Sequence, residues 1–96
     1  MALFVVQHKH DAETCPAGHP EMGPALVQHV SPANTAKFGV DVKADAVVDG
    51  AHTFYLIIEA PSATEVESFM TPFSQMGSVD IWPSSSCERV VARGKC

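Results

Sequence analysis

The sequence is poor in basic residues and in cysteine, and it contains no long hydrophobic run. Its 96 residues include 6 Lys and Arg against 11 Asp and Glu, which gives a formal net charge of −5. A chain this acidic is not expected to bind nucleic acid or an anionic membrane surface. No apolar stretch approaches the roughly 20 residues that a transmembrane helix requires. The apolar residues 1–6 are too few for the core of a secretion signal and have no basic residue before them.

The three cysteines, Cys15, Cys87 and Cys96, are odd in number and too few for a disulfide framework. They predict a protein of the reducing cytoplasm. Hydrophobic residues make up 46% of the chain and charged residues 18%, so the composition is that of a core-forming protein rather than a disordered one. The length corresponds to a single domain spanning residues 1–96.

Hydrophobic periodicity and turn signals predict the elements in chain order. Residues 3–10 read as a strand, and residues 24–39 as a helix that is interrupted at Ser31-Pro32. Residues 40–48 and 51–60 are two strands of a hairpin around Asp49-Gly50. A helix with a capping box, Ser62 and Glu65, ends near Gly77 and precedes a short strand at residues 79–83. Residues 87–93 form either a terminal helical turn or an extended tail.

This order of elements predicts an α+β protein with the ferredoxin-like βαββαβ arrangement. Two right-handed crossovers joined by a hairpin place both helices on one face of a four-stranded antiparallel sheet. The other face of the sheet is left bare, and it carries apolar residues at Leu3, Val5, Tyr55 and Ile57. Such a face predicts a symmetric homodimer. The alternative is a monomer in which residues 87–96 cover the sheet.

The element order, the length, and the segment from Met70 to Gly77 before the last strand resemble a known group of proteins. These are the small stand-alone dimeric α+β proteins of ferredoxin-like fold, which include cofactor-free monooxygenases, muconolactone-isomerase-like proteins and nickel-binding proteins. The resemblance is architectural and covers nearly the whole chain. It implies a homodimer, and it does not select an activity, because function on this fold depends on the site.

Four of the five histidines and one cysteine are expected to gather at one edge of the sheet. His8 and His10 lie two residues apart on the first strand, so their side chains share a face about 6.6 Å apart along the backbone. Cys15 and His19 follow in a loop rich in Pro and Gly, and the neighbouring antiparallel strand brings His52 to the same edge. Nitrogen and sulfur ligands of this kind suit nickel, copper or zinc. The predicted ligands of a transition-metal ion are therefore His8, His10, Cys15, His19 and His52.

Five candidates exceed the usual four ligand places, and we expect His19 to be the one that does not bind the metal, because Gly18 and Pro20 flank it. His29 lies in the middle of a predicted helix, and we expect it to be a structural histidine that is solvent-facing or hydrogen-bonded. Cys87 and Cys96 follow the last strand and are expected at the opposite edge of the sheet.

Two other functions are consistent with the sequence. One is a cofactor-free monooxygenase or isomerase that acts on a small apolar substrate in a cleft between helices and sheet, with His52 or His10 as general base. This function makes a small-molecule ligand a further expected partner. The other is a structural or accessory dimer without a site. Of these three functions, the sequence favours metal binding.

Overall fold

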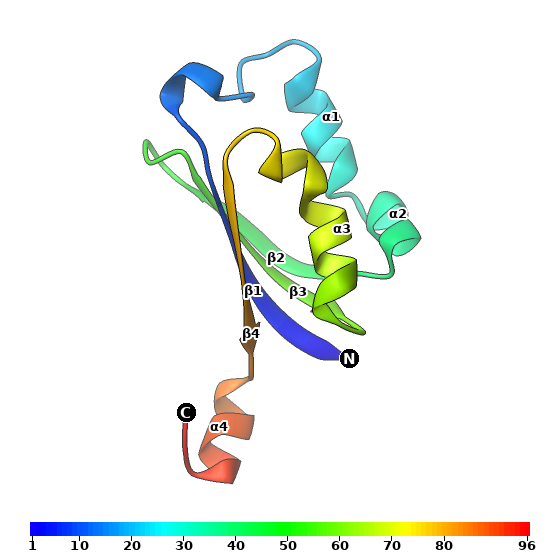
Figure 1. Ribbon diagram of the computed structural model, residues 1–96, viewed down its shortest axis with the longest axis vertical. Coiled ribbons are helices and arrows are strands. Elements are labelled where there is room, and N and C mark those ends of the chain that lie inside the picture. The colour runs from blue at the N-terminus through cyan, green and yellow to red at the C-terminus, as the bar shows by residue number, and fades with distance from the viewer.

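The computed structural model describes all 96 residues and contains a four-stranded antiparallel sheet with helices packed on it (Figure 1). The strands are β1 (Ala2–Lys9), β2 (Asp41–Val48), β3 (Thr53–Ala60) and β4 (Ser78–Ser84). The α-helices are α1 (Met22–His29), α2 (Pro32–Thr35), α3 (Ala63–Ser74) and α4 (Cys87–Arg93), with 3-10 turns at Ala12–Thr14 and Ala36–Phe38. The strand order β2-β3-β1-β4 makes β1 and β3 the central strands. The predicted α+β class and antiparallel sheet are confirmed.

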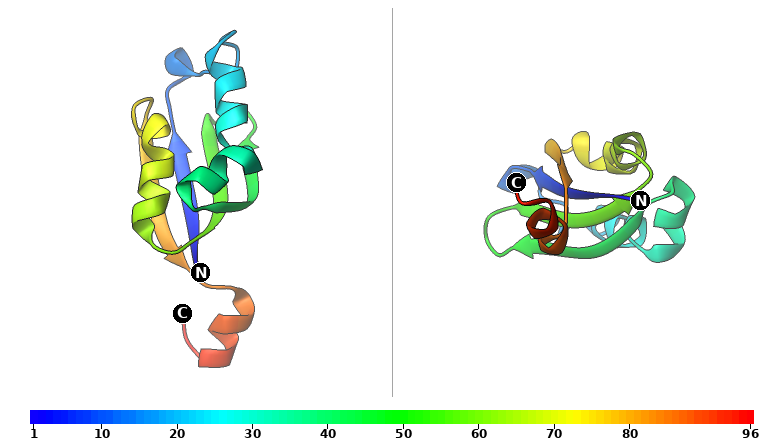
Figure 2. Two further views of the ribbon diagram at one scale, coloured as in Figure 1. Left: turned by 90° about the vertical axis from the view of Figure 1, so that its right-hand side faces the viewer. Right: turned by 90° about the horizontal axis from the view of Figure 1, so that it is seen from below.

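The hydrophobic core lies between the sheet and α3, on the side of the sheet that the helices cover (Figure 2). Alternate residues of the two central strands point into it, as strand geometry requires. Helix α3 adds the apolar stripe that its helical spacing predicted, and each fully buried large side chain contributes about 1.5–3 kcal/mol of hydrophobic free energy. The buried hydrophobic residues of these elements are Phe4, Val6, Leu56, Ile58, Ala60, Val66, Phe69, Met70 and Phe73.

The β2–β3 hairpin turn is longer than its sequence signal suggests. Strand β3 begins at Thr53, paired with Val48, and not at residue 51. His52 therefore lies in the turn, with a left-handed backbone φ of 49°, which is uncommon for a residue other than glycine. The expectation that His52 is the second residue of a strand is wrong, because four residues are used to reverse the chain. His52 still reaches the predicted edge of the sheet.

The helix boundaries differ from the predicted ones by a few residues. The predicted interruption at Ser31-Pro32 separates α1 from α2, and Gly39 ends the following 3-10 turn with a left-handed φ of 72°. Helix α1 begins before Pro24 rather than at it. At the start of α3 the Ser62 hydroxyl donates a hydrogen bond to the Glu65 carboxylate but accepts none from a backbone N–H, so this part of the predicted box does not form.

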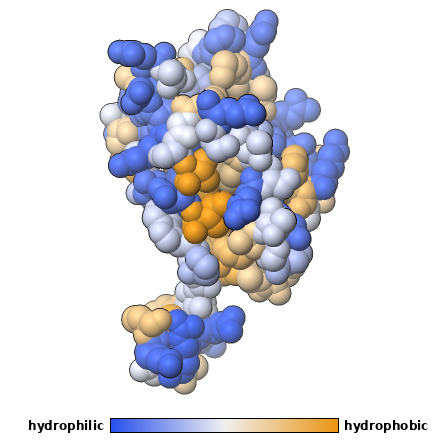
Figure 3. Space-filling model, viewed as in Figure 1, coloured by the Kyte–Doolittle hydropathy of each residue, from blue (hydrophilic) through white to orange (hydrophobic).

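Residues 87–93 form a helix, α4, that lies beyond the end of β4. The hydroxyl oxygen of Ser86 caps it by accepting a hydrogen bond from the Arg89 N–H at 3.2 Å. Helix α4 has no buried residue, and Figure 3 shows it as a separate lobe joined to the body by a narrow neck. The tail therefore does not cover the sheet. No helix in the chain combines the length and the apolar character needed to cross a membrane.

Candidate metal centre

Three of the predicted ligands converge at the edge of the sheet where β1 ends. His10, Cys15 and His52 each place one ligand atom within 4.8 Å of the other two. In a tetrahedral zinc site, ligand atoms lie roughly 3.3–3.8 Å apart, as follows from metal–ligand bonds of about 2.0–2.3 Å. Small side-chain rotations are therefore enough to bring the three atoms onto one ion.

The backbone holds the three ligands in place from three separate segments. The His10 N–H donates a hydrogen bond to the His52 carbonyl oxygen at 3.2 Å, which ties the end of β1 to the hairpin turn. The two imidazole rings meet edge to face, with centroids 5.2 Å apart. The 3-10 turn after β1 then reverses the chain, and the Cys15 N–H closes it on the Ala12 carbonyl oxygen at 3.4 Å. This reversal brings Cys15 back toward His10.

His8 lies beside this group but is not one of the three converging ligands. It is 2% exposed, and its ring stacks on that of His10 and meets Phe73 edge-on, with both pairs of centroids 5.3 Å apart. Its Nδ1 lies 3.1 Å from the Ser78 carbonyl oxygen. Because a carbonyl oxygen only accepts, Nδ1 carries the proton and Nε2 is left with a free lone pair. That Nε2 is buried and has no hydrogen-bond partner.

The ring nitrogens of His10 also lack hydrogen-bond partners. Both Nδ1 and Nε2 are buried without a hydrogen-bond partner. A buried polar group left unpaired costs about 1–3 kcal/mol, so such groups need an explanation. Burial, reinforced by the neighbouring imidazoles, lowers the pKa of both His8 and His10, and the hydrogen bond to Ser78 only partly opposes this in His8. Both rings are held in the neutral form, which is the form that binds a metal ion.

The side chains of the other two histidines form hydrogen bonds with backbone groups. His19 is exposed, and its Nδ1 accepts hydrogen bonds from the N–H groups of Glu21 and Met22 at 3.1 and 3.0 Å, which caps the start of α1. It lies outside the converging group. The Nε2 of His29 donates to the Phe69 carbonyl oxygen at 2.7 Å, and its Nδ1 accepts from Asn34 at 3.2 Å. Of the two forms predicted for His29, the structure has the hydrogen-bonded one.

The remaining cysteines are remote from the site. Cys87 and Cys96 are exposed free thiols in and after α4, at the end of the molecule opposite the hairpin turn (Figure 1). The predicted placement of these two residues agrees with the structure.

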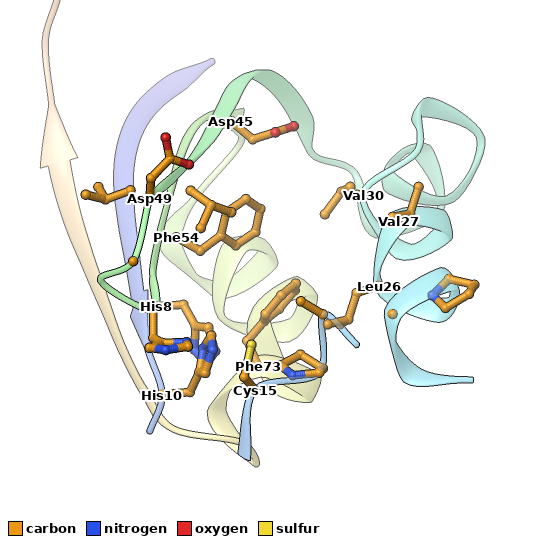
Figure 4. A pocket seen from close by; sticks show the side chains of 18 residues that line it. His8, His10, Cys15, Leu26, Val27, Val30, Asp45, Asp49, Phe54 and Phe73 are labelled. Atoms are coloured by element: carbon orange, nitrogen blue, oxygen red, sulfur yellow. The ribbon is translucent and has the colours of Figure 1, made fainter. Parts of the chain in front are cut away.

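A cavity of about 740 Å³ opens beside the three ligands, between α1 and the β2–β3 hairpin (Figure 4). His8, His10, Cys15 and His52 line one part of it, and apolar side chains line most of the rest. The sequence predicts a cleft between helices and sheet in general terms, but not this position. The apolar residues of α1 and β2 that line the cavity are Pro24, Leu26, Val27, Val47 and Val48, and Val30 lines it directly after the end of α1.

The buried imidazoles predict how the stability of the metal-free protein depends on pH. The unfolded chain takes up protons on its histidines below about pH 6.5, whereas His8 and His10 in the folded chain resist protonation to lower pH. Stability should therefore be constant above that pH and fall as the pH drops below it, until the folded-state pKa values are reached. Urea unfolding in the presence of a chelator measures this. His8→Gln should flatten the dependence and His19→Ala should not, and an unchanged slope in His8→Gln would contradict the expectation.

Comparison with models of protein families, with curated proteins and with solved structures gave no match to this chain. The likeness to small dimeric α+β proteins is therefore supported by the element order and the sheet alone. Fold does not determine activity, so the function has to be argued from the site.

Proposed function

We propose that the protein binds one transition-metal ion through His10, Cys15 and His52. The observation that carries this proposal is the convergence of their ligand atoms within 4.8 Å, from the end of β1, the loop that follows it and the distant β2–β3 turn. Two imidazoles and one thiolate suit zinc, nickel or copper and do not suit magnesium or calcium. A reducing compartment such as the cytoplasm, predicted from the odd number of cysteines, keeps Cys15 available as the thiol that the site needs.

The number of protein ligands favours a site that exchanges or uses its metal. Structural zinc sites have four protein ligands, whereas three protein ligands leave a fourth position for water or substrate. The free lone pair on the Nε2 of His8 is suited to accept a hydrogen bond from a water molecule that binds the metal there. We therefore assign His8, a ligand in the sequence-based prediction, to the surroundings of the open position.

The direct test is titration of the reduced, chelator-treated protein with Co²⁺. We expect one equivalent to bind, with a thiolate-to-metal charge-transfer band from Cys15 in the near ultraviolet. Zn²⁺ should also raise the free energy of unfolding, by about 2.7 kcal/mol at a free concentration one hundred times its Kd. Absence of binding, or binding without the thiolate band, would contradict the proposal.

A cofactor-free enzyme is the second candidate function, and the cavity is the observation that favours it. Burial lowers the pKa of His10, so its neutral ring lines an apolar cavity and is able to accept a proton from a substrate. Full activity on any substrate after removal of all metal would support this function over the first.

We also propose that the helix-free face of the sheet joins two copies of the chain. Register places Trp82, Val5 and Ile57 side by side across β4, β1 and β3, and Trp82 and Ile57 are exposed. The hydroxyl of Tyr55 donates to the Gln7 side chain at 2.9 Å on the same face. A row of large apolar side chains across three strands is the kind of exposed surface that marks protein–protein contacts.

Sedimentation equilibrium at micromolar concentration should therefore report about twice the chain mass of 10.2 kDa. Ile57→Lys should give a folded monomer, because it places two charges in a symmetric apolar interface. Val27→Lys, an equivalent change on the helix side of the molecule, should leave the dimer intact. A monomeric wild-type protein would remove this part of the proposal.

A further inference from the structure

We infer that the cavity beside the metal centre binds a small amphiphilic acid. Its single anionic group occupies the open position on the metal, and its apolar body lies between α1 and the β2–β3 hairpin. This inference rests on the proposed metal site and adds the chemical class of the molecule that the site receives.

The size and lining of the cavity match a ligand pocket. Its volume of about 740 Å³ lies within the range of roughly 300–1,000 Å³ that is usual for small-molecule sites. Val27 of α1 is 71% exposed and Val47 of β2 is 60% exposed, and both line the cavity. Apolar side chains on two walls that remain this open gain hydrophobic free energy when an apolar body fills the space.

The imidazole and thiol groups of the cavity that are able to ligate a metal are gathered at one end, where the ligand's head group would lie. Both ring nitrogens of His10 are buried without partners, and His10 lines the cavity together with Cys15 and His52, the other two ligands of the metal that would hold the anionic group. Figure 4 shows His8 and His10 close to Cys15, while Leu26 and Val27 of α1 and the following Val30 line the space on the other side. One polar end and apolar walls define an elongated ligand with a head and a tail.

Charge defines the head group and limits the tail. A divalent ion bound by two neutral imidazoles and one thiolate keeps a net charge of +1, which favours a single anionic ligand. No Lys or Arg lines the cavity to bind a second anionic group. Asp45 and Asp49 line its hairpin side, away from Cys15 and His10 in Figure 4, and their carboxylates repel a negative tail. The tail is therefore apolar, with a neutral or cationic end.

The experiment titrates the Co²⁺-loaded protein with straight-chain alkanoates from acetate to octanoate and follows the visible spectrum of the metal. Each methylene added inside the cavity should tighten binding about threefold to fourfold. Octanedioate, which adds a second carboxylate at the same length, should bind more weakly than octanoate. The ω-amino derivative of octanoate, which has a cationic end in place of the second carboxylate, should bind more tightly than octanedioate.

A pair of matched variants locates the tail. Val27→Ser should weaken octanoate binding at least about threefold and leave acetate binding unchanged, since only the longer chain reaches α1. Val91→Ser is the control, because Val91 is 73% exposed on α4, far from the cavity. Neither variant should alter the affinity for Co²⁺ itself.

The outcomes separate the inference from the metal site on which it rests. If Co²⁺ binds but alkanoate affinity does not rise with chain length, the inference is overturned and the metal site stands. If octanedioate binds as tightly as octanoate, the assignment of a single anionic group is wrong. If Co²⁺ does not bind, both the metal site and the inference are overturned.

Discussion

Replacing any one of His10, Cys15 and His52 should weaken metal binding by more than about 100-fold and leave the domain folded. Substitution of residues that only orient a ligand typically costs 10–100-fold, so loss of one ligand out of three should cost more. None of the three belongs to the hydrophobic core, which lies further along the sheet under α3. Their removal should therefore affect the metal far more than the fold.

The variants are chosen to suit the backbone at each position. Cys15→Ser removes a ligand with little change in volume, and His10→Ala removes one without adding backbone strain. His52→Gly is preferred to alanine, because the left-handed φ of 49° at this position suits glycine. Competition titration with a coloured chelator measures each affinity. His19→Ala is the control and should bind metal as the wild type does, and an equal loss there would show that the sequence-based ligand set was the better one.

His8 is the residue that decides whether the fourth position is open. A residue that only contacts a metal-bound group should cost about 10–100-fold when replaced, which is less than the loss of a ligand. His8→Gln should fall in that range. A loss as large as that of His10→Ala would make His8 the fourth ligand, close the coordination shell and exclude the amphiphilic acid from the metal.

The sheet and its helices were predictable because their sequence signals are local and repetitive. The i, i+3, i+4, i+7 stripe of α3 indicates one buried face, and the uninterrupted apolar run from Phe54 to Ile58 after the Asp49-Gly50 turn indicates a strand. The prediction that His52 meets His10 followed from the antiparallel pairing of β1 with β3. It succeeded although His52 lies in a turn, because the end of β1 and the turn before β3 meet at the same edge of the sheet.

The details of the cavity depend on features that no local pattern reveals. The proton position on His8 is set by the Ser78 carbonyl, 70 residues away in the chain. In β2 the register shifts between Val42 and Ala44. Before the shift an even-numbered residue, Val42, pairs with a helix-facing residue of β3. After it the odd-numbered Asp45 and Val47 do so, opposite Leu56 and Phe54. A bulge of this kind reverses which side chains face the helices. The sequence alternation of β2 therefore could not identify the walls of the cavity.

Gly77→Ala should destabilise the protein by about 3 kcal/mol or more, at the upper end of the cost of overpacking. Gly77 connects α3 to β4 and packs directly against the end of β1. A Cβ atom there would lie 2.0 Å from the Lys9 carbonyl oxygen and 3.1 Å from the Cα of His10. Backbone atoms of a paired strand cannot rotate away, so relief requires the end of β1 to move. That movement displaces His10, and metal affinity should fall together with stability.

Gly18→Ala is the matched control for this substitution. Gly18 lies in the loop between Cys15 and α1, its added Cβ would have no neighbour within 4 Å, and its φ is outside the left-handed region. There the lower entropy of the unfolded chain should make alanine neutral or stabilising by up to about 1 kcal/mol. Urea unfolding compares the two variants, and Co²⁺ titration under native conditions reports the site. If Gly77→Ala unfolds at the wild-type urea concentration, β1 is not held against the α3–β4 turn, and the position of His10 must be fixed by its hydrogen bond to His52 alone.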